Sequence, residues 1–460
     1  MAYDDGVDTI ITCDNGISAI DQIQYAKDLG LTVIVTDHHD VPFIEEDGVR
    51  TFLSSQADAI INPKQIECEY KFKSICGAGV AFKLMEALYE EIGMDKEECY
   101  KLIEFVAIAT VCDVVDLIDE NRIFVKNGLE MLNNSKNIGI NALKKACGLE
   151  DKKITVYHLG FVIGPCLNAS GRLDSAKKGL ELLLMEDDEE AEKLAQEIVD
   201  LNDARKNMTK EGVDRAINII DSTDINNDKI LVVYIPDIHE SLAGIVAGRV
   251  KEKYNKPTII LIKSEEGVKG SARSIEEYNE FEGLLACKEL LDKFGGHPMA
   301  VGLSLQEDKV DELRKALNNK CELTDEDLTR KIMIDSSLPL EYLNLHLIEE
   351  LNVLEPFGKG NSKPVFGVRD AKITKAILLG KDKNVLKLKL LTNNDITIDA
   401  MIFNDLENFE SKIIEKYGNE GLDNLYNKSN NNISMDFTFY PSINEWNGNK
   451  SIQIVVNGIR

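Results

Sequence analysis

The sequence lacks several features that mark other classes of protein. Its 460 residues contain no apolar stretch that approaches roughly twenty residues, so we expect no membrane-spanning helix. The first residues contain no basic region followed by an apolar core, and we therefore expect no secretory signal. The nine cysteines are scattered and include no Cys-x-x-Cys pair, which argues against zinc ribbons and a disulfide framework. This usage predicts reduced thiols and a cytoplasmic protein.

Positive charge is also scarce. The chain has 53 Lys and Arg against 80 Asp and Glu, which gives a net charge of -27. Such a balance is unfavourable for nucleic-acid binding over the whole surface, although binding to phosphates needs only a local basic surface. Residues 249–273 are rich in Lys and Arg and contain few acids. A solvated helix face followed by an ordinary loop explains this segment equally well.

The pattern of apolar residues divides the chain into four parts. A chain of this length is expected to form about two or three domains. Alternating strands and helices over 1–175 predict an α/β domain with a parallel sheet covered by helices on both faces. A long charged helix with a narrow apolar stripe, in 176–227, suits a connector. We predict a second, smaller α/β domain at 228–320 and an OB-like β-barrel, built from short alternating segments, at 330–460.

Polar side chains follow two neighbouring strands of the first domain, predicted at residues 9–13 and 33–36. The residues that follow these strands are Asp14, Asp37, His38 and His39. The carboxyl edge of a parallel sheet is where open α/β folds place their active sites. Each feature alone has a simpler explanation, because Asp before Asn-Gly is a turn signal and histidines can cap a helix. Their occurrence at the ends of two adjacent strands favours a metal site instead.

A third carboxylate supports this interpretation. Asp113 interrupts an otherwise apolar segment, and a lone buried charge is costly unless it is paired or bound to a metal. Mixed carboxylate and imidazole ligands suit Mn²⁺ or Mg²⁺, and two such ions can support a phosphoryl displacement. The predicted chemistry is hydrolysis of a phosphodiester or a pyrophosphate.

These residues resemble a known family. Residues 12–17 and 36–39 are similar to the DHH phosphoesterase superfamily, and further segments narrow the resemblance to the RecJ single-stranded-DNA exonucleases. Those segments are 109–117, 160–173, 270–274, 294–302, 354–361 and 451–456. The resemblance covers almost the whole chain and implies a DHH domain, a connector helix, a DHHA1-type domain and an OB-like barrel, in that order.

The resemblance also implies an activity. It is the processive removal of nucleotides from single-stranded DNA in the 5′-to-3′ direction, with Mn²⁺ or Mg²⁺ at a two-ion site, in DNA repair and recombination. The ligand would be single-stranded DNA, and a helicase and a single-strand-binding protein would be partners. No membrane association is implied.

Roles for individual residues come from the same resemblance. Asp14 is similar to a carboxylate that bridges two ions, and His38 and Asp113 are similar to ligands of one of them. His39 resembles a catalytic histidine near the scissile phosphate, and Asp37 a catalytic-site residue that orients its neighbours. The residues that resemble substrate contacts are Arg172, Ser271, Arg273, Gly296 and His297. Without the resemblance, Arg273 and His297 would be interpreted as a salt-bridging arginine and a core histidine.

One motif of the family is missing. The family carries Asp-x-Asp-x-Asp-Gly on an earlier strand, and residues 1–6 do not replace it because no apolar strand precedes their acids. The chain therefore resembles an amino-terminally truncated form, and we expect it to bind metal weakly and to hydrolyse DNA poorly.

Two alternative functions stay open. One is a nuclease-inactive protein that binds single-stranded DNA. The other is a DHH phosphodiesterase for cyclic dinucleotides or short oligonucleotides, although such relatives usually end before a barrel. The single tryptophan, Trp446, lies in a predicted hairpin turn, where stacking on a base and packing at the barrel rim are equally plausible.

Overall fold

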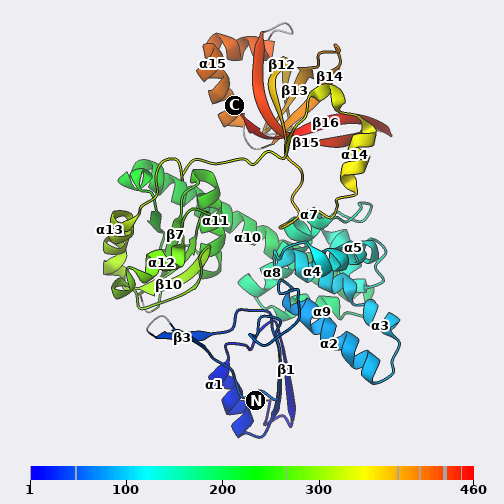
Figure 1. Ribbon diagram of the computed structural model, residues 1–460, viewed down its shortest axis with the longest axis vertical. Coiled ribbons are helices and arrows are strands. Elements are labelled where there is room, and N and C mark those ends of the chain that lie inside the picture. Colours follow the sequence, from blue (N-terminus) through cyan, green and yellow to red (C-terminus); the bar gives the residue numbers. More distant parts are fainter. Residues whose placement is uncertain are drawn as a thin grey trace. The chain divides into compact units, whose positions relative to one another are not determined.

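The protein is described from a computed structural model that covers residues 2–46, 49–265, 267–380, 383–403, 406–427, 432–446 and 448–460. The chain forms two compact units, and each is described by itself. The first consists of Met1–Asn133 together with Ile332–Arg460, and the second of Asn134–Lys331. Figure 1 labels the helices and strands of both units. In the described part of the chain, no helix is long and apolar enough to cross a membrane.

The first unit begins with a parallel sheet in the order β1-β2-β5, as the sequence predicts. Its strands are β1 (Thr9–Cys13), β2 (Thr32–Thr36) and β5 (Ala59–Ile61). Side chains alternate between the two faces of a strand. Ile60 packs in a cluster with residues of α1 (Ile20–Asp28), whereas Ile61 packs in a cluster with residues of α2 (Gly77–Glu91). The two helices therefore cover opposite faces of the sheet.

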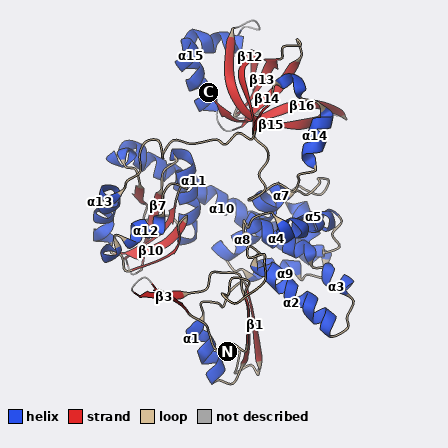
Figure 2. Cartoon of the chain, in the orientation of Figure 1, coloured by secondary structure: helices blue, strands red, loops and turns tan. Residues whose placement is uncertain are grey.

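Helices and one hairpin complete this part of the first unit. They are the antiparallel pair β3 (Phe43–Glu46) and β4 (Val49–Phe52), followed by α3 (Lys96–Tyr100), α4 (Ile103–Cys112) and α5 (Asp119–Asn133). From α2 to α10 the helices follow one another without an intervening strand (Figure 2). Val106 and Ala107 of α4 are almost fully buried, which explains the apolar character of that segment.

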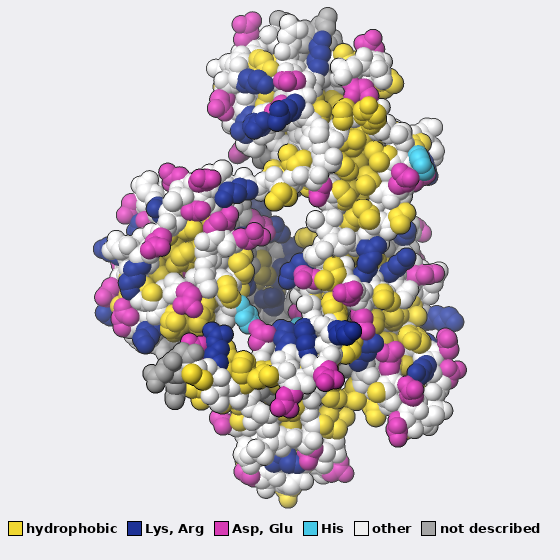
Figure 3. Space-filling model, viewed as in Figure 1, with side chains coloured by type: hydrophobic (Ala, Val, Ile, Leu, Met, Phe, Trp, Pro, Cys, Tyr) yellow, Lys and Arg dark blue, Asp and Glu magenta, His cyan; other side chains and the backbone are white. Residues whose placement is uncertain are grey.

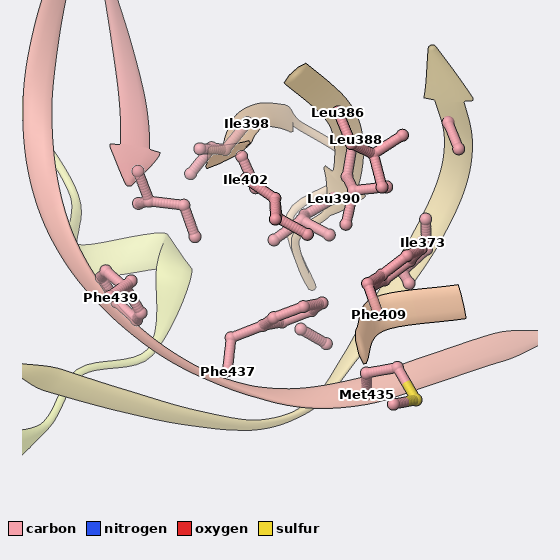
Figure 4. Close-up of a cluster of buried hydrophobic side chains, with 14 of the residues drawn as sticks. Ile373, Leu386, Leu388, Leu390, Ile398, Ile402, Phe409, Met435, Phe437 and Phe439 are labelled. Carbon is pink, nitrogen blue, oxygen red and sulfur yellow. The ribbon is translucent and has the colours of Figure 1, made fainter. Parts of the chain in front are cut away.

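The carboxyl-terminal part of the first unit is a closed five-stranded barrel. Its strands are β12 (Phe366–Leu379), β13 (Val385–Leu391), β14 (Thr397–Phe403), β16 (Asn449–Ile459) and β15 (Ile433–Trp446), and β15 pairs again with β12. Every second residue of β13 is buried, and Phe409, Phe437 and Phe439 belong to the cluster of buried hydrophobic side chains that forms the core of the barrel (Figure 4). The prediction of an OB-like barrel is confirmed.

Three further elements flank this barrel. They are β11 (Ser336–Ser337), α14 (Leu345–Asn352) and α15 (Leu406–Asn427). Helix α15 supplies Phe409 and Ile413 to the barrel core. The side chain of Trp446 lies outside the described part of the structure, so its two interpretations stay predictions.

The second unit begins with helices and ends with a mixed sheet. The helices are α6 (Ile138–Ala146), α7 (Val156–His158), a π-helix (Leu159–Ile163), α8 (Gly164–Leu173), α9 (Lys177–Leu183) and α10 (Asp188–Ser222). The side chain of Asp187 caps α10 by accepting a hydrogen bond of 2.9 Å from the backbone of Glu190. Ala191, Ala195 and Ile198 form part of its buried stripe, as the sequence predicts for a long helix with a narrow apolar face.

The sheet of the second unit has the order β6-β7-β8-β10-β9. Its strands are β6 (Leu231–Tyr234), β7 (Thr258–Ser264), β8 (Gly267–Arg273), β9 (Lys293–His297) and β10 (Ala300–Leu305). Strands β6 and β7 are parallel and the other pairs are antiparallel. Its helices are α11 (Ala243–Tyr254), α12 (Glu280–Leu285) and α13 (Val310–Lys320). This arrangement confirms the smaller α/β domain.

Candidate metal centre and substrate contacts

The ends of β1 and β2 bring the first group of predicted residues together. Cys13 pairs with Thr36 in the parallel register, so the residue after each strand reaches the same edge of the sheet. The backbone N–H of Asp14 donates to the carbonyl of Thr36 at 3.1 Å, which fixes the turn that follows β1. Asp14, His38 and His39 each offer one atom that could bind a metal, and these three atoms lie within 4.8 Å of one another.

His38 lies at the centre of this group. Its Nε2 is 3.0 Å from Oδ1 of Asp14 and 3.5 Å from Oδ2 of Asp113. The side chain is only 11% exposed, and Nε2 has no well-aligned hydrogen-bond partner among the described groups. A buried ring nitrogen that faces two carboxylates in this way fits a cation shared by all three side chains.

Asp113 is less buried than the sequence suggests. Helix α4 ends at Cys112, and Asp113 is its C-cap with a side chain that is 41% exposed. The expectation of a lone buried charge was therefore wrong, because the helix ends at Cys112 and the carboxylate that follows lies outside its buried turns. Partial burial still raises the pKa of Asp113; His38 lowers it by a smaller amount, and repulsion from Asp14 adds to the increase.

Asp37 acts on its neighbours through hydrogen bonds. Its side chain is 1% exposed, its Oδ2 accepts from the N–H of Ile17 at 2.9 Å, and its Oδ1 accepts from the N–H groups of His38 at 2.7 Å and His39 at 3.2 Å. Burial acts to raise its pKa, but these hydrogen bonds and the His39 ring outweigh it and hold the pKa below its usual value. Nδ1 of His39 lies 2.7 Å from the same Oδ1.

Two residues near this group were missed by sequence reasoning. Gly77, the first residue of α2, lies against Asp14, and a Cβ at this position would be only 2.5 Å from the Cβ of Asp14. Asn62, at the end of β5, donates from Nδ2 to the carbonyl of His39 at 2.9 Å. Strand β5 ends directly before Asn62. This position is the sequence signal that could have identified Asn62 as part of the same sheet edge.

The predicted substrate contacts lie in the second unit. Arg273 and His297 are both opposite Ala300, so they occupy one row across β8, β10 and β9. Nη1 of Arg273 donates to Oγ of Ser271 at 2.9 Å. Gly244 of α11 leaves room for this guanidinium, since a Cβ there would be 2.7 Å from Nη2 of Arg273.

Arg172 is close to the same guanidinium. Its Nη1 donates to the carbonyl of Ser241 at 2.9 Å. Burial lowers the pKa of Arg273, and the positive charge of Arg172 lowers it further. Among the described residues, no carboxylate forms an ion pair with Arg172 or Arg273. Two neighbouring guanidinium groups without a carboxylate suit a phosphate ligand.

A groove of about 410 Å³ adjoins Ser271 in the second unit. Gly295 and Gly302 face each other in the pairing of β9 with β10, and a Cβ at Gly295 would have no atom within 4 Å. Gly296 differs, because its φ of +150° and the nearby backbone of Val301 leave no room for a side chain. The residues that line the groove are Glu240, Ala243, Ile262, Lys269, Gly270, Ser271, Lys293, Phe294, Gly295, Gly302, Leu303 and Ser304.

The positive charge of residues 249–273 is partly neutralised. Arg249 pairs with Glu252 at 3.2 Å, and Lys269 pairs with Glu240 at 2.9 Å. Over the face in Figure 3, Lys and Arg side chains are interspersed with Asp and Glu side chains. This segment therefore agrees with an ordinary solvated surface, and charge alone does not mark it as a binding site.

Comparison with known proteins agrees with this arrangement of domains. Three family models match the chain: "DHH family, N-terminal domain" at residues 3–110, "DHHA1 domain" at 227–323 and "RecJ OB domain" at 334–458. A solved structure of RecJ from Thermus thermophilus in complex with Mn²⁺ superimposes with a TM-score of 0.79 and 26% identity. The superposition covers 100% of this chain and 62% of the Thermus thermophilus chain.

Two curated relatives bear the name single-stranded-DNA-specific exonuclease RecJ. The protein from Bacillus subtilis is 36% identical over 98% of this chain, which spans 54% of that relative. The protein from Haemophilus influenzae is 33% identical over 100% of this chain, which spans 78% of that relative. The chain thus spans about half to three quarters of the curated relatives that it matches. On these similarities, the chain belongs to the RecJ family of single-stranded-DNA-specific exonucleases.

Proposed function

We propose that this chain acts in the exonucleolytic hydrolysis of single-stranded DNA, in the 5′-to-3′ direction, with Mn²⁺ or Mg²⁺ as cofactor. The observation that carries the proposal is the position of His38 Nε2 close to both Asp14 and Asp113, where it finds no hydrogen-bond partner among the described residues. RecJ of Thermus thermophilus has structures in complex with Mn²⁺ and with Mg²⁺. A divalent ion is thus supported both by the ligand set and by similar proteins.

Asp14, His38 and Asp113 would hold the ion, and Asp14 would also contribute to a second ion site. A bound divalent ion would supply an activated water and would stabilise negative charge on the phosphoryl oxygens. We assign to His39 a place beside the scissile phosphate. Asp37 fixes the His39 ring through Nδ1, so Nε2 is the ring nitrogen available to the substrate.

The second group of residues would hold the DNA backbone. Arg273 and Arg172 offer guanidinium groups to phosphates, and Ser271 adds a hydroxyl beside them. His297 lies in the same row as Arg273, and the chain at Gly296 can approach a ligand closely because it carries no side chain. These five contacts are proposals that rest on the family resemblance and on this geometry.

Further features of the whole protein are proposals as well. They are the four-part division at 1–175, 176–227, 228–320 and 330–460, a cytoplasmic location, a role in DNA repair and recombination, and cooperation with a helicase and a single-strand-binding protein. The match of residues 334–458 to the RecJ OB domain disfavours the alternative of a phosphodiesterase for cyclic dinucleotides.

Metal binding gives the most direct test. Titration of the 460-residue chain with Mn²⁺ in a calorimeter should show binding that becomes at least about ten-fold weaker in His38→Ala and in Asp113→Asn. His346→Ala is a matched control, since this histidine is highly exposed on α14 and pairs with Glu350 at 3.5 Å. Equal affinity in the wild type and all three variants would overturn the proposed metal centre.

Nuclease activity tests the reaction itself. A single strand labelled at its 3′ end should be shortened from its 5′ end in the presence of Mn²⁺ under single-turnover conditions, which detect a slow reaction, and His38→Ala should abolish this. Tight binding with no release of nucleotides would favour the nuclease-inactive DNA-binding protein. Faster cleavage of dinucleotides than of long strands would favour the small-substrate phosphodiesterase.

A further inference from the structure

A loop from the carboxyl-terminal region of the first unit contacts the domain that carries the metal ligands. This loop consists of residues 354–361 and is called the glycine loop below. Arg122 of α5 donates hydrogen bonds to the carbonyls of Val353 at 3.2 Å, Leu354 at 2.7 Å and Glu355 at 2.8 Å, 231 to 233 residues further along the chain. Three bonds from one planar guanidinium hold the start of the loop in one orientation.

The backbone of the loop packs against Asp116 and Leu117, three and four residues after Asp113. The N–H of Leu117 donates to the carbonyl of Lys359 at 2.7 Å. A Cβ at Gly358 would be 2.5 Å from Cδ1 of Leu117, and a Cβ at Gly360, whose φ is +73°, would be 2.8 Å from the Cβ of Asp116. The glycines on both sides of Lys359 are therefore required for this close approach.

The loop is also closed on itself. Nδ2 of Asn361 donates to the carbonyls of Leu354 and Pro356, both at 2.9 Å, and the N–H of Gly358 donates to the carbonyl of Asn361 at 2.9 Å. Phe357 is buried and meets the ring of Tyr440 edge-on, with the centroids 6.0 Å apart. The position of the Lys359 backbone is thus fixed by contacts that do not involve the Lys359 side chain.

The side chain of Lys359 is left available. It is 61% exposed, and its Nζ is 3.7 Å from Oδ1 of Asp116, a separation at which an exposed ion pair contributes little. Asp116 follows Asp113 by three residues, and the charge of Lys359 acts on the Asp113 carboxyl. The loop therefore presents an ammonium group near the carboxylates of Asp113 and Asp116, whose negative charge would repel a polyanion.

We propose that Lys359 binds a phosphate of the single-stranded DNA beside the metal centre, and that the glycine loop is built to present it there. This inference rests on the proposed function. An ε-ammonium is a compact point charge that binds phosphate without a fixed orientation, which suits a strand that moves through the site. If Lys359 served only to pair with Asp116, its removal would change stability slightly and leave DNA binding unchanged.

The test compares the binding of a single strand by wild type, Lys359→Ala, Lys359→Arg and Lys101→Ala in the full 460-residue chain. Lys101 is the matched control, because it is exposed in the same domain and pairs with Glu98 at 2.6 Å. Fluorescence anisotropy in EDTA, over a range of NaCl concentrations, gives the slope of log K against log salt. Loss of one phosphate contact should reduce this slope by about 0.7 and the affinity roughly three- to ten-fold.

Lys359→Arg should keep the wild-type slope of log K against log salt. Lys101→Ala should have the same slope and the same affinity for single strands as the wild type. A second variant, Gly360→Ala, keeps the lysine but displaces the loop, and it should lower affinity in the same direction. An unchanged slope in Lys359→Ala, with wild-type binding of DNA and Mn²⁺ intact, overturns this inference and leaves the proposed function standing. A wild-type chain that binds neither Mn²⁺ nor single strands overturns both.

Discussion

The Asp37 carboxylate lies 2.7 Å from Nδ1 of His39 and receives three further hydrogen bonds from backbone N–H groups. All four donors belong to two segments, one after each of the strands β1 and β2. Asp37 therefore links the two strand ends, and its hydrogen bonds leave Nε2 of His38 and Nε2 of His39 unused. A buried carboxylate with this many donors stays ionised at neutral pH.

Asp37→Asn should lower the free energy of unfolding and should hold the ends of β1 and β2 together less firmly. An amide offers one accepting oxygen instead of two and places an NH₂ group against a backbone N–H, so we expect a loss of about 1–3 kcal/mol at pH 7. Because the pKa of Asp37 is lowered by folding, its contribution is full above the unfolded value of 3.8 and is lost as the pH falls below it. The difference between wild type and variant in urea unfolding should therefore shrink from pH 7 to pH 3.

Asp40→Asn provides the control, since Asp40 is exposed and pairs with Lys64 at 2.9 Å. We expect this substitution to change the free energy of unfolding by less than about 1 kcal/mol. If Asp37→Asn behaved like Asp40→Asn, the carboxylate would not have the structural role that its hydrogen bonds indicate.

Gly77→Ala should weaken metal binding without unfolding the protein. The added methyl group would meet the Asp14 side chain, with distances of 2.5 Å to its Cβ and 2.6 Å to its Cγ, so Asp14 must move. Alanine favours a helix over glycine by about 1 kcal/mol, so the helix itself is not weakened. The Mn²⁺ affinity should fall about ten-fold, whereas Gly248→Ala on α11, where a Cβ meets no atom within 4 Å, should leave it unchanged. Equal Mn²⁺ affinities in both variants would mean that Asp14 is not a ligand, or that the first turn of α2 moves to make room for the methyl group.

Much of the architecture follows from local sequence patterns. The alternation of apolar and polar residues predicts β13 with the bounds that the structure has, Val385–Leu391. Asp14 and His38 were expected to meet because consecutive parallel strands deliver their next residues to one edge. These predictions depend on interactions between residues close in sequence, or on the rule that neighbouring parallel strands share an edge.

Other features depend on contacts between residues that are far apart in the sequence. No local pattern indicates that Gly77 lies against Asp14, or that Arg122 holds a loop 232 residues further along. Asp113 was expected to be buried because apolar residues precede it, yet the helix ends at Cys112 and the carboxylate leaves the core. Burial is decided by tertiary packing, which the composition of one segment does not determine.

Arg273→Lys should weaken the binding of single strands while Mn²⁺ binding stays unchanged. The guanidinium donates at the same time to Oγ of Ser271 at 2.9 Å and to the carbonyl of Ala272 at 2.7 Å, which orients its remaining N–H groups. A lysine cannot make this fork, so we expect affinity to fall about ten-fold in fluorescence anisotropy. Arg249→Lys, at an exposed position that pairs with Glu252, should bind like the wild type. Unchanged affinity in Arg273→Lys would remove Arg273 from the proposed contacts.

Glu280→Gln should change how stability depends on pH. Glu280 is fully buried in the first turn of α12, and burial raises its pKa to about 8. The nearby Ser274 hydroxyl offsets this only partly, because it donates to the carbonyl of Tyr278 at 2.8 Å. In the unfolded chain the carboxyl ionises near its ordinary value of 4.5.

The sign of the effect follows from this difference. Between pH 4.5 and about 8 the folded state holds a proton that the unfolded state has lost, so stability falls as the pH rises through this window. Glutamine removes the titration, although its buried amide adds a cost that does not depend on pH. Relative to the wild type, Glu280→Gln should therefore gain roughly 2–4 kcal/mol between pH 5 and pH 8.5 in urea unfolding. Glu282→Gln, on the exposed side of the same helix turn, should show no such gain, and parallel profiles for all three proteins would contradict a neutral Glu280 in the folded state.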